Sequence, residues 1–193
     1  MSMMGELTFF LGLQIKKMEN GTFISQTKYY KEVLKKFGMD TAKEASTPMG
    51  TSCYLDKDES GIEVNETMFR GMIGFLLYLT TSRPDIMLSV CVCDRFQANP
   101  KESYHTGVKR ILKYLKGTTC FGLWYPSGGS PNLIGYSDAD YSGYKIDRKS
   151  TSGTCHLLES SLVSWHSKKQ ACVVLSTTEA EYIAAGNCLK FIG

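Results

Sequence analysis

The chain has 193 residues, of which 42% are hydrophobic and 21% are charged, and its formal net charge is +3. This length suits one large domain or two small ones, and the composition is that of an ordinary globular protein. The net charge is too small to indicate a nucleic-acid partner by itself. No apolar stretch is long enough to cross a bilayer, and the start of the chain lacks the basic region of a secretory signal, so we expect neither a membrane partner nor secretion.

The cysteines bear on the redox environment of the protein. There are seven of them, an odd number, and no C-x-x-C pair occurs. Disulfide frameworks usually have an even number of cysteines, and zinc sites usually have characteristically spaced pairs. We therefore predict reduced, mostly buried thiols in an intracellular protein, either cytoplasmic or nuclear.

The first third of the chain predicts a hairpin, a helix and a linker. Asn20 and Gly21 tolerate positive φ angles, and this dipeptide between two apolar runs is a strong hairpin signal. The region after the helix is polar and rich in turn residues, which is typical of a loop. The expected elements are strands at Thr8–Lys16 and Thr22–Gln26, a helix at Thr27–Phe37, and a loop or linker at Asp40–Glu66.

The middle of the chain predicts three helices, at Met68–Thr80, Asp85–Phe96 and Pro100–Lys116. Pro84 separates the first two, because proline restricts the residue before it. Asn99 is expected to cap the third helix, with Pro100 in its first turn. The core face of the third helix is expected to consist of Val108, Ile111, Leu112 and Leu115.

The third of these helices also carries a basic stripe. Its members are Lys109, Lys113 and Lys116, with Arg110 beside them. Two interpretations are open, a solvated helix face or a set of contacts to a phosphate backbone.

From Phe121 the pattern changes to β. Strands are expected at Phe121–Tyr125, Leu133–Tyr141, Gly153–Leu158 and Leu162–Trp165, with a short strand or strand end at Val173–Leu175. A helix is expected from Ser176, because Ser176 and Glu179 have the spacing of a capping box. The change from helices to strands predicts two domains, residues 1–117 and 118–193.

Two aspartates lie within one of the predicted strands. Asp138 and Asp140 alternate with small residues, so both point to one face of the strand. An unpaired acid on a buried strand is costly. Asp140 has an alternative role, capping a turn near Ser142 and Gly143, whereas Asp138 lies deeper in the strand.

The final helix offers a partner for Asp138. Glu179 already has a structural role in the capping box, and Glu181 lies about 200° further around the helix. Glu181 shares its side with Ala184 and Ala185, small residues that allow a helix to approach a sheet closely. Oxygen ligands from a strand aspartate and a helix glutamate suit Mg²⁺, and paired Mg²⁺ ions support phosphodiester hydrolysis.

Seven motifs follow one another between Met4 and Gly186: MGELTFFLGLQIKK, RGMIGFLLYLTTSRPDI, VKRILKYLKGT, GYSDADYSG, DRKSTSGTCHLL, LVSWHSKKQ and LSTTEAEYIAAG. In this order the chain resembles the pol polyprotein of copia-type LTR retrotransposons, especially those of plants. The resemblance implies an α+β fold. Residues 1–117 would be a palm-end hairpin with the helical thumb and connection of a reverse transcriptase, and 118–193 an incomplete RNase H-like mixed sheet with a helix.

The resemblance also implies roles for individual residues. Asp138 is similar to the first catalytic aspartate of RNase H, and Glu181, in EYIA, to its catalytic glutamate, so both would be Mg²⁺ ligands. Glu179 is the fallback for that glutamate. Arg148 and Lys149, in DRKSTSG, would touch the phosphates of an RNA–DNA hybrid, although turn chemistry explains much of that motif. The segment GELTFFLGLQI is similar to the primer-grip hairpin.

Several parts of the family pattern are not found in the sequence. These are the Y-x-D-D pair of the polymerase, the C-D-N sequence with a third RNase H carboxylate, and a fourth acidic ligand. Two carboxylates hold Mg²⁺ weakly, so we expect Mg²⁺ binding to be weak or absent. We therefore predict a truncated fragment without polymerase or nuclease activity as an isolated chain.

Two functional hypotheses follow. In one, a partner or second copy completes the site, and the protein becomes an Mg²⁺-dependent RNase H acting on RNA–DNA hybrids. In the other, the fragment is a non-catalytic module, repurposed by its host, that binds protein or nucleic acid. An exposed edge at the first strand of the RNase H-like sheet would favour a protein partner.

Overall fold

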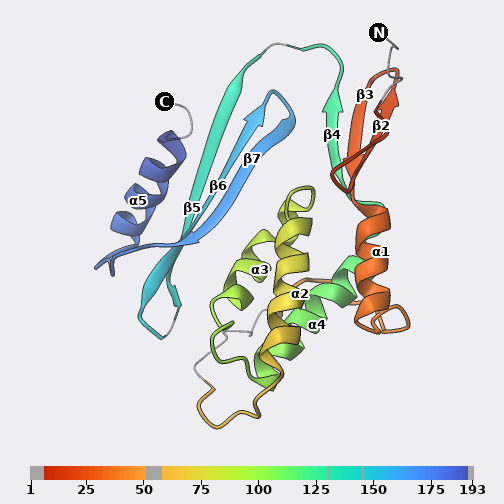
Figure 1. The fold of residues 1–193 in the computed structure, drawn as a ribbon. Helices are drawn as coiled ribbons and strands as arrows, with labels where there is room; N and C mark the ends of the chain where they lie inside the picture. Colours follow the sequence, from red (N-terminus) through yellow and green to blue (C-terminus); the bar gives the residue numbers. More distant parts are fainter. Residues whose placement is uncertain (1–6, 51–57, 130, 145, 191–193) are drawn as a thin grey trace.

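The computed structural model describes residues 7–50, 58–129, 131–144 and 146–190, and its elements form an α+β fold (Figure 1). The strands are β1 Phe9–Phe10, β2 Leu13–Met18, β3 Gly21–Ser25, β4 Leu123–Pro126, β5 Leu133–Tyr144, β6 Lys149–Leu158 and β7 Ser161–Lys169. The helices are α1 Thr27–Lys36, α2 Glu66–Leu79, α3 Met87–Asp94, α4 Glu102–Gly117 and α5 Thr177–Leu189, with a 3-10 turn at Pro84–Ile86. In Figure 1 the two sheets rise above helices α1–α4, and α5 lies apart from those helices beside β5.

The first sheet joins the two ends of the helical region. It has the order β1-β2-β3-β4, and its ladders are antiparallel. The predicted hairpin is confirmed, but its turn is at Glu19 and Asn20, because Gly21 is the first residue of β3 and lies opposite Met18. Strand β4 follows the predicted boundary at Gly117 in sequence, yet it pairs with β3, Leu123 lying opposite Ile24. The two halves of the chain therefore share this sheet.

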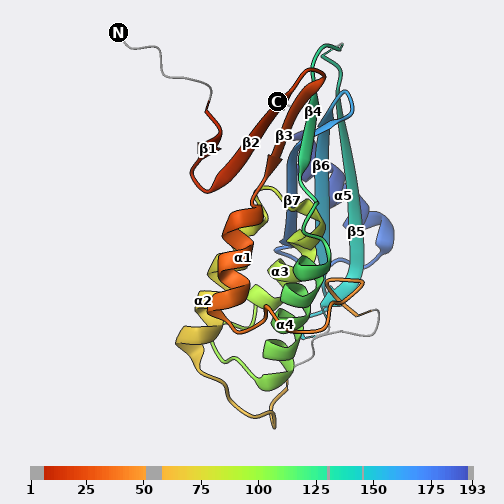
Figure 2. The same ribbon diagram turned by 90° about the vertical axis from the view of Figure 1, so that its right-hand side faces the viewer.

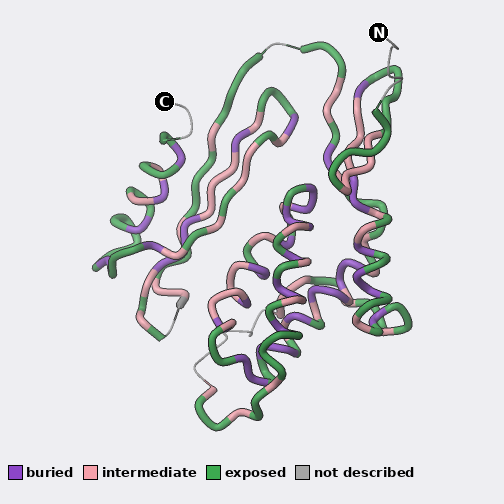
Figure 3. The backbone as a smooth tube through the Cα atoms, viewed as in Figure 1, coloured by how far each residue is buried: buried purple, intermediate pink, exposed green. Residues whose placement is uncertain are grey.

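The hydrophobic core lies among helices α1–α4. The burial pattern in Figure 3 places most of the buried backbone in these helices, whereas β5 is exposed over most of its length. The predicted core face of α4 is confirmed, because its four members are at most 1% exposed: Val108, Ile111, Leu112 and Leu115. These residues pack in one cluster with the apolar side of α2 and with Val33 of α1.

A buried arginine connects the turn after α2 to the end of α4. Arg83 precedes the 3-10 turn and is 2% exposed. Its guanidinium donates to both carboxylate oxygens of Asp85, at 3.0 and 2.7 Å, and to the carbonyl and hydroxyl oxygens of Thr118, at 3.1 and 2.6 Å. The Tyr114 hydroxyl also donates to Asp85, at 2.8 Å. This network joins the turn after α2 to the end of α4.

The second sheet has the order β5-β6-β7 and is packed on both faces (Figure 2). A Cβ atom built on Gly135 would lie 2.7 Å from the Cys188 sulfur, so the face that carries Gly135 meets α5. On the other side, the indole nitrogen of Trp165 donates to the carbonyl oxygen of Thr80, at 2.8 Å. That bond ties the sheet to the end of α2.

Several sequence predictions differ from the structure in detail. Helix α4 begins at Glu102, and Asn99 does not cap it, because Lys101 is extended and bridges Glu63. Val173–Leu175 is not a strand but the bend that leads into α5. Strands β6 and β7 are longer than predicted, and the ladders of their sheet are antiparallel rather than mixed.

Two further predicted elements are divided in the structure. A turn at Leu11 and Gly12, both with positive φ, breaks the predicted strand Thr8–Lys16 into β1 and β2, which pair with each other. The predicted helix Asp85–Phe96 is a 3-10 turn followed by α3. The left-handed residue after α1 is Gly38, with φ +62°. Residues 51–57 of the predicted linker lie outside the described residues, and the described parts on either side contain turns and bends. No helix in the described ranges is long and apolar enough to cross a bilayer.

Candidate functional site

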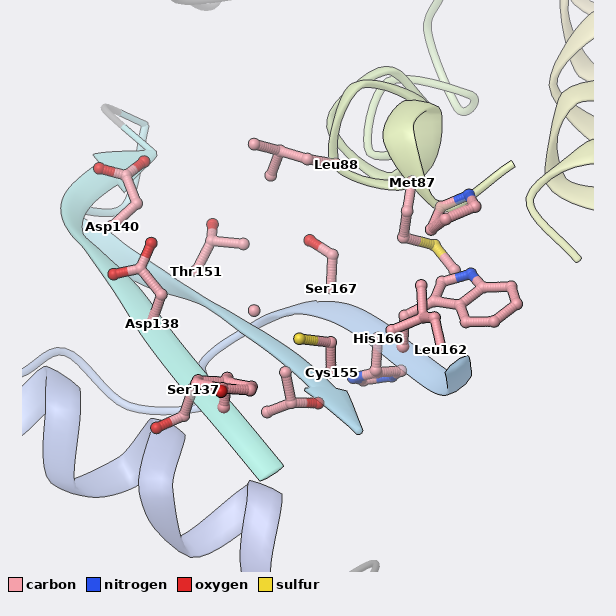
Figure 4. A pocket seen from close by; sticks show the side chains of 15 residues that line it. Met87, Leu88, Ser137, Asp138, Asp140, Thr151, Cys155, Leu162, His166 and Ser167 are labelled. Atoms are coloured by element: carbon pink, nitrogen blue, oxygen red, sulfur yellow. The ribbon is translucent and has the colours of Figure 1, made fainter. Parts of the chain in front are cut away.

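The two strand aspartates lie on the face of the second sheet that is turned toward α3 (Figure 4). Side chains alternate along a strand, so Asp138 and Asp140 share a face that Gly135 does not. Across the ladder, Asp138 is opposite Gly153, and Gly153 is opposite Ser167. This row forms the floor of a cavity of about 380 Å³ whose other wall includes Met87 and Leu88 of α3.

Partial burial and the charge of a neighbouring aspartate change the pKa of Asp140. Partial burial raises the pKa of the Asp140 carboxyl, and the neighbouring Asp138 carboxylate raises it further. The positive charge of Arg95, at the end of α3, opposes this rise. Arg95 also donates to the hydroxyl of Thr151, the residue opposite Asp140, at 3.0 Å. The acidic pair therefore lies beside a link between α3 and the sheet.

Asp140 lies against the turn near which the sequence analysis gave it an alternative role. A side chain at Gly143 would collide with the Asp140 carboxylate, so that carboxylate lies against the backbone of the turn. The ladder register shifts between Asp140 and Tyr144, as expected for a β-bulge. Asp140 thus packs against the irregular end of β5, whereas Asp138 lies within its regular part.

The two glutamates of α5 have different hydrogen-bond partners. The Ser176 hydroxyl accepts from the Glu179 amide at 3.1 Å, and the Glu179 carboxylate accepts from the Leu175 amide at 2.8 Å. Glu179 is therefore engaged at the start of the helix. Glu181 is free of that role, and its carboxylate accepts from the amide of Ala139 at 3.2 Å.

Asp138 and Glu181 thus flank one peptide unit of β5, although they approach it from different sides. Glu181 comes from α5, which packs on the Gly135 face, while Asp138 points into the cavity near α3 (Figure 4). Within the described residues, no three or more His, Cys, Asp or Glu side chains form a group that could hold a metal ion. The carboxylates present therefore fit only part of an Mg²⁺ site, since Mg²⁺ requires near-octahedral oxygen coordination.

Two members of the basic stripe on α4 are engaged within the protein. Arg110 donates to the carbonyl and hydroxyl oxygens of Thr47, at 3.2 and 2.9 Å. Lys116 donates to the carbonyl oxygen of Ala42, at 2.8 Å. Both residues fasten α4 to the loop after α1. Lys109 is exposed and Lys113 is half-buried, and these two are the better candidates for phosphate contacts.

The basic residues of the β5–β6 turn are held by an aspartate. Arg148 adopts a positive φ of 54°, and the Lys149 amide donates to Asp147 at 3.2 Å. Lys169 donates to the same carboxylate at 2.9 Å. Burial alone would raise the pKa of Asp147, but the hydrogen bond from Lys169, the other bonds and the charges lower it. The motif thus has a turn role, while phosphate contact by Arg148 and Lys149 stays a prediction.

Replacing Lys109 and Lys113 together by alanine is expected to reduce the salt dependence of binding to an RNA–DNA hybrid. Each lysine that contacts a phosphate contributes roughly 0.7–0.9 to the slope of log K against log salt concentration. Fluorescence anisotropy with a labelled hybrid over a salt series measures this slope. The control removes the same charge from α1, with Lys31→Ala and Lys35→Ala. Equal slopes for the two double variants would make the stripe a solvated helix face.

Sequence reasoning missed the residues that make the cavity. Gly153 lies opposite Asp138, and Ser167 opposite Gly153, only because of the strand register. Beside the cavity, Arg95 reaches Thr151 of the sheet from a helix far away in sequence. The available signal was a glycine within a strand, which often marks a close approach of another group.

Comparison with known proteins shows which proteins this chain resembles. It is 40% identical over 182 residues to the Retrovirus-related Pol polyprotein from transposon RE1 of Arabidopsis thaliana, an alignment that covers 94% of this chain and 12% of that polyprotein. It is 40% identical over 188 residues to the corresponding polyprotein from transposon TNT 1-94 of Nicotiana tabacum, covering 91% and 14%. It is 37% identical over 190 residues to the Uncharacterized mitochondrial protein AtMg00810 of Arabidopsis thaliana, covering 94% and 75%.

The chain belongs to the family of retrovirus-related Pol polyproteins of plant transposons. It spans about an eighth of the length of the polyproteins it matches, 12% of one and 14% of the other. No protein-family profile matches the chain. No solved structure matches it either.

Proposed function

We propose that the chain is a segment of a copia-type Pol polyprotein that joins the end of a reverse transcriptase to the start of an RNase H-like domain. In this proposal residues 1–117 are palm end, thumb and connection, and residues 118–193 begin the RNase H-like domain. The similarity to transposon polyproteins over nearly the whole chain supports this assignment. So does the order of elements after β4, an antiparallel meander β5-β6-β7 followed by a helix.

The observation that carries the proposal is the position of two carboxylates around one peptide of β5. Glu181 lies 3.2 Å from the Ala139 amide, and Asp138 is the residue before it. Oxygen ligands of this kind suit Mg²⁺, which when bound would polarise a phosphodiester and activate water. The two side chains approach β5 from different sides, so they supply part of an ion site and require further ligands.

We therefore infer that residues 1–193 alone neither copy nor cut nucleic acid. Further ligands would come from a second polypeptide segment, docked along the edge of β5. In the described residues, that strand pairs with β6 on one side only. Strand addition is a common way for an edge strand to bind a partner. With the site completed, the assembly would be an Mg²⁺-dependent RNase H acting on RNA–DNA hybrids.

The state of the cysteines supports a reducing compartment. Six of the seven cysteines are in described positions, and each of these six is a free thiol. Disulfides are rare in the cytosol and the nucleus. The proposal therefore places the protein in one of these compartments.

The test is cleavage of a labelled RNA–DNA hybrid by the purified chain, with Mg²⁺ or Mn²⁺, beside the variants Asp138→Asn and Glu181→Gln. No cleavage above the level of a protein-free control is expected from any of the three. The absence of cleavage is informative only if the chain is folded. Circular dichroism with a cooperative melting curve shows that it is folded. Cleavage by the unaltered chain that either variant abolishes would contradict the inference that the site is incomplete, while supporting the assignment of its ligands.

A further inference from the structure

The floor of the cavity beside α3 includes a glycine that faces open space. A Cβ atom built on Gly153 would meet nothing within 4 Å, although this residue lies in the middle strand of the sheet. Its neighbours across the ladder are Asp138 and Ser167. A glycine within a strand usually weakens it, and often marks a place where another group approaches the backbone closely.

The walls of this cavity are mostly apolar. Met87 and Leu88 of α3 lie on one side, and Leu162 of β7 lies on another (Figure 4). Trp165 of β7 also lines the cavity. Leu88 is 50% exposed, which is high for a large apolar side chain on the inner side of a helix. The volume of about 380 Å³ lies in the range of small-molecule sites, which bury an apolar body and fix it with a few polar groups.

Three polar side chains of the cavity, Asp138, Asp140 and Ser167, can attract a cation or accept a hydrogen bond. Asp138 and Asp140 stand together at one end, where their charges repel phosphate and attract a cation. The Ser167 hydroxyl oxygen is buried and makes no hydrogen bond within the described part of the chain. Buried polar atoms usually have a partner. An N–H group of a ligand would supply one.

We propose that this cavity binds an organic cation with a flat apolar body, whose positive group lies beside the carboxylates of Asp138 and Asp140. The flat body fills the space above Gly153, between Leu88 and Trp165. Among the described residues that line the cavity, Asp138 and Asp140 are the only Asp, Glu, Lys or Arg side chains, so the lining favours a cation over an anion. This inference is drawn from the lining of the cavity, and it does not depend on the proposed nuclease assignment.

The test compares two ligands of nearly equal shape, 9-aminoacridine, which is a cation at neutral pH, and acridine, which is neutral. Binding is measured by isothermal titration calorimetry on the whole chain. We expect the cation to bind at least about tenfold more tightly, a difference of about 1.4 kcal/mol. Quenching of Trp165 fluorescence in a chain that carries Trp124→Phe locates the ligand, because the chain has two tryptophans. Equal affinities for the two ligands would overturn the proposal.

Two variants localise the binding. The double variant Asp138→Asn with Asp140→Asn is expected to remove the preference for the cation, whereas Glu32→Gln with Asp40→Asn, which removes two exposed charges elsewhere, is expected to keep it. Gly153→Leu fills the cavity and is expected to abolish binding of the cation. Unchanged binding by either cavity variant would place the ligand elsewhere and overturn the proposal. The comparison of the two ligands uses the unaltered chain. It therefore tests the preference for the cation even where a variant fails to fold.

Discussion

Replacing Arg83 by alanine is expected to lower the free energy of unfolding by roughly 3–5 kcal/mol, the cost of breaking a buried ion pair by removing one partner. The guanidinium is 2% exposed and bonded to both Asp85 and Thr118. It also lies over the rings of Tyr114 and Phe121, with centroid distances of 5.7 and 5.4 Å. Urea unfolding followed by circular dichroism measures the change.

The control for this variant is Arg70→Ala. Arg70 forms an ion pair with Glu66 on the surface of α2, where both side chains are about half exposed. Such pairs contribute about 0–1 kcal/mol, so this variant is expected to unfold close to the unaltered chain. Similar losses for both arginines would mean that burial of the Arg83 network contributes nothing particular to stability.

Because of the same network, the free energy of unfolding is expected to fall as the solution becomes acidic. Burial alone would raise the pKa of Asp85, but the hydrogen bond and charge of Arg83, with the Tyr114 hydroxyl, lower it below its ordinary value of 3.8. A carboxylate with a lowered folded pKa stabilises the protein above its unfolded pKa, and that contribution is lost as the pH falls through the folded pKa. The unaltered chain should therefore lose more stability below pH 3.8 than the Arg83→Ala variant does.

The sequence predicts correctly those features that depend on residues close together along the chain. Ser176 caps α5 as its spacing from Glu179 predicts, and the Glu179 carboxylate accepts from the amide of Leu175, the residue before the cap. Glu179, and not Glu181, is therefore engaged at the start of the helix. The apolar spacing of α4 predicted its buried face correctly, because a helix presents residues three and four apart on one side. Gly38 ends α1 in the left-handed conformation for a similarly local reason.

Features that depend on which distant segments meet were not predictable in this way. The pattern of β4 predicts a strand, but not that it pairs with β3 across nearly a hundred residues. The alternation around Asp138 predicts that it shares a face with Asp140, but not whether α5 or α3 covers that face. The structure places α3 there, so the predicted partners Asp138 and Glu181 meet at one peptide from different sides. The register that puts Gly153 beside Asp138 is also a property of the assembled sheet.

Placing a glutamate at Ala184 is expected to release α5 from the second sheet while leaving the helical core folded. Ala184 is fully buried, and with Ala180 and Cys188 it forms the stripe by which α5 contacts β5 and β6. A carboxylate at this buried position would lose its water, which costs several kcal/mol. Cys188 at the end of the stripe accepts a hydrogen bond through its carbonyl from His156 at 3.1 Å, and the Gln170 amide donates to Ala180 at 2.9 Å. Both bonds need the docked helix.

Hydrogen exchange followed by mass spectrometry distinguishes release of α5 from general unfolding. Peptides from α5, β5 and β6 should lose protection by roughly 100-fold or more, since each 1.4 kcal/mol corresponds to a factor of ten, while peptides from α2 and α4 should change little. Their side chains pack in a separate cluster that Ala184 does not touch. The matched control is Tyr182→Glu, which adds the same charge to the outer side of the same helix, where Tyr182 is 75% exposed. Equal protection in the two variants would show that the alanine stripe does not hold α5, and loss of protection throughout the Ala184→Glu chain would show that the sheet and the helical core unfold as one unit.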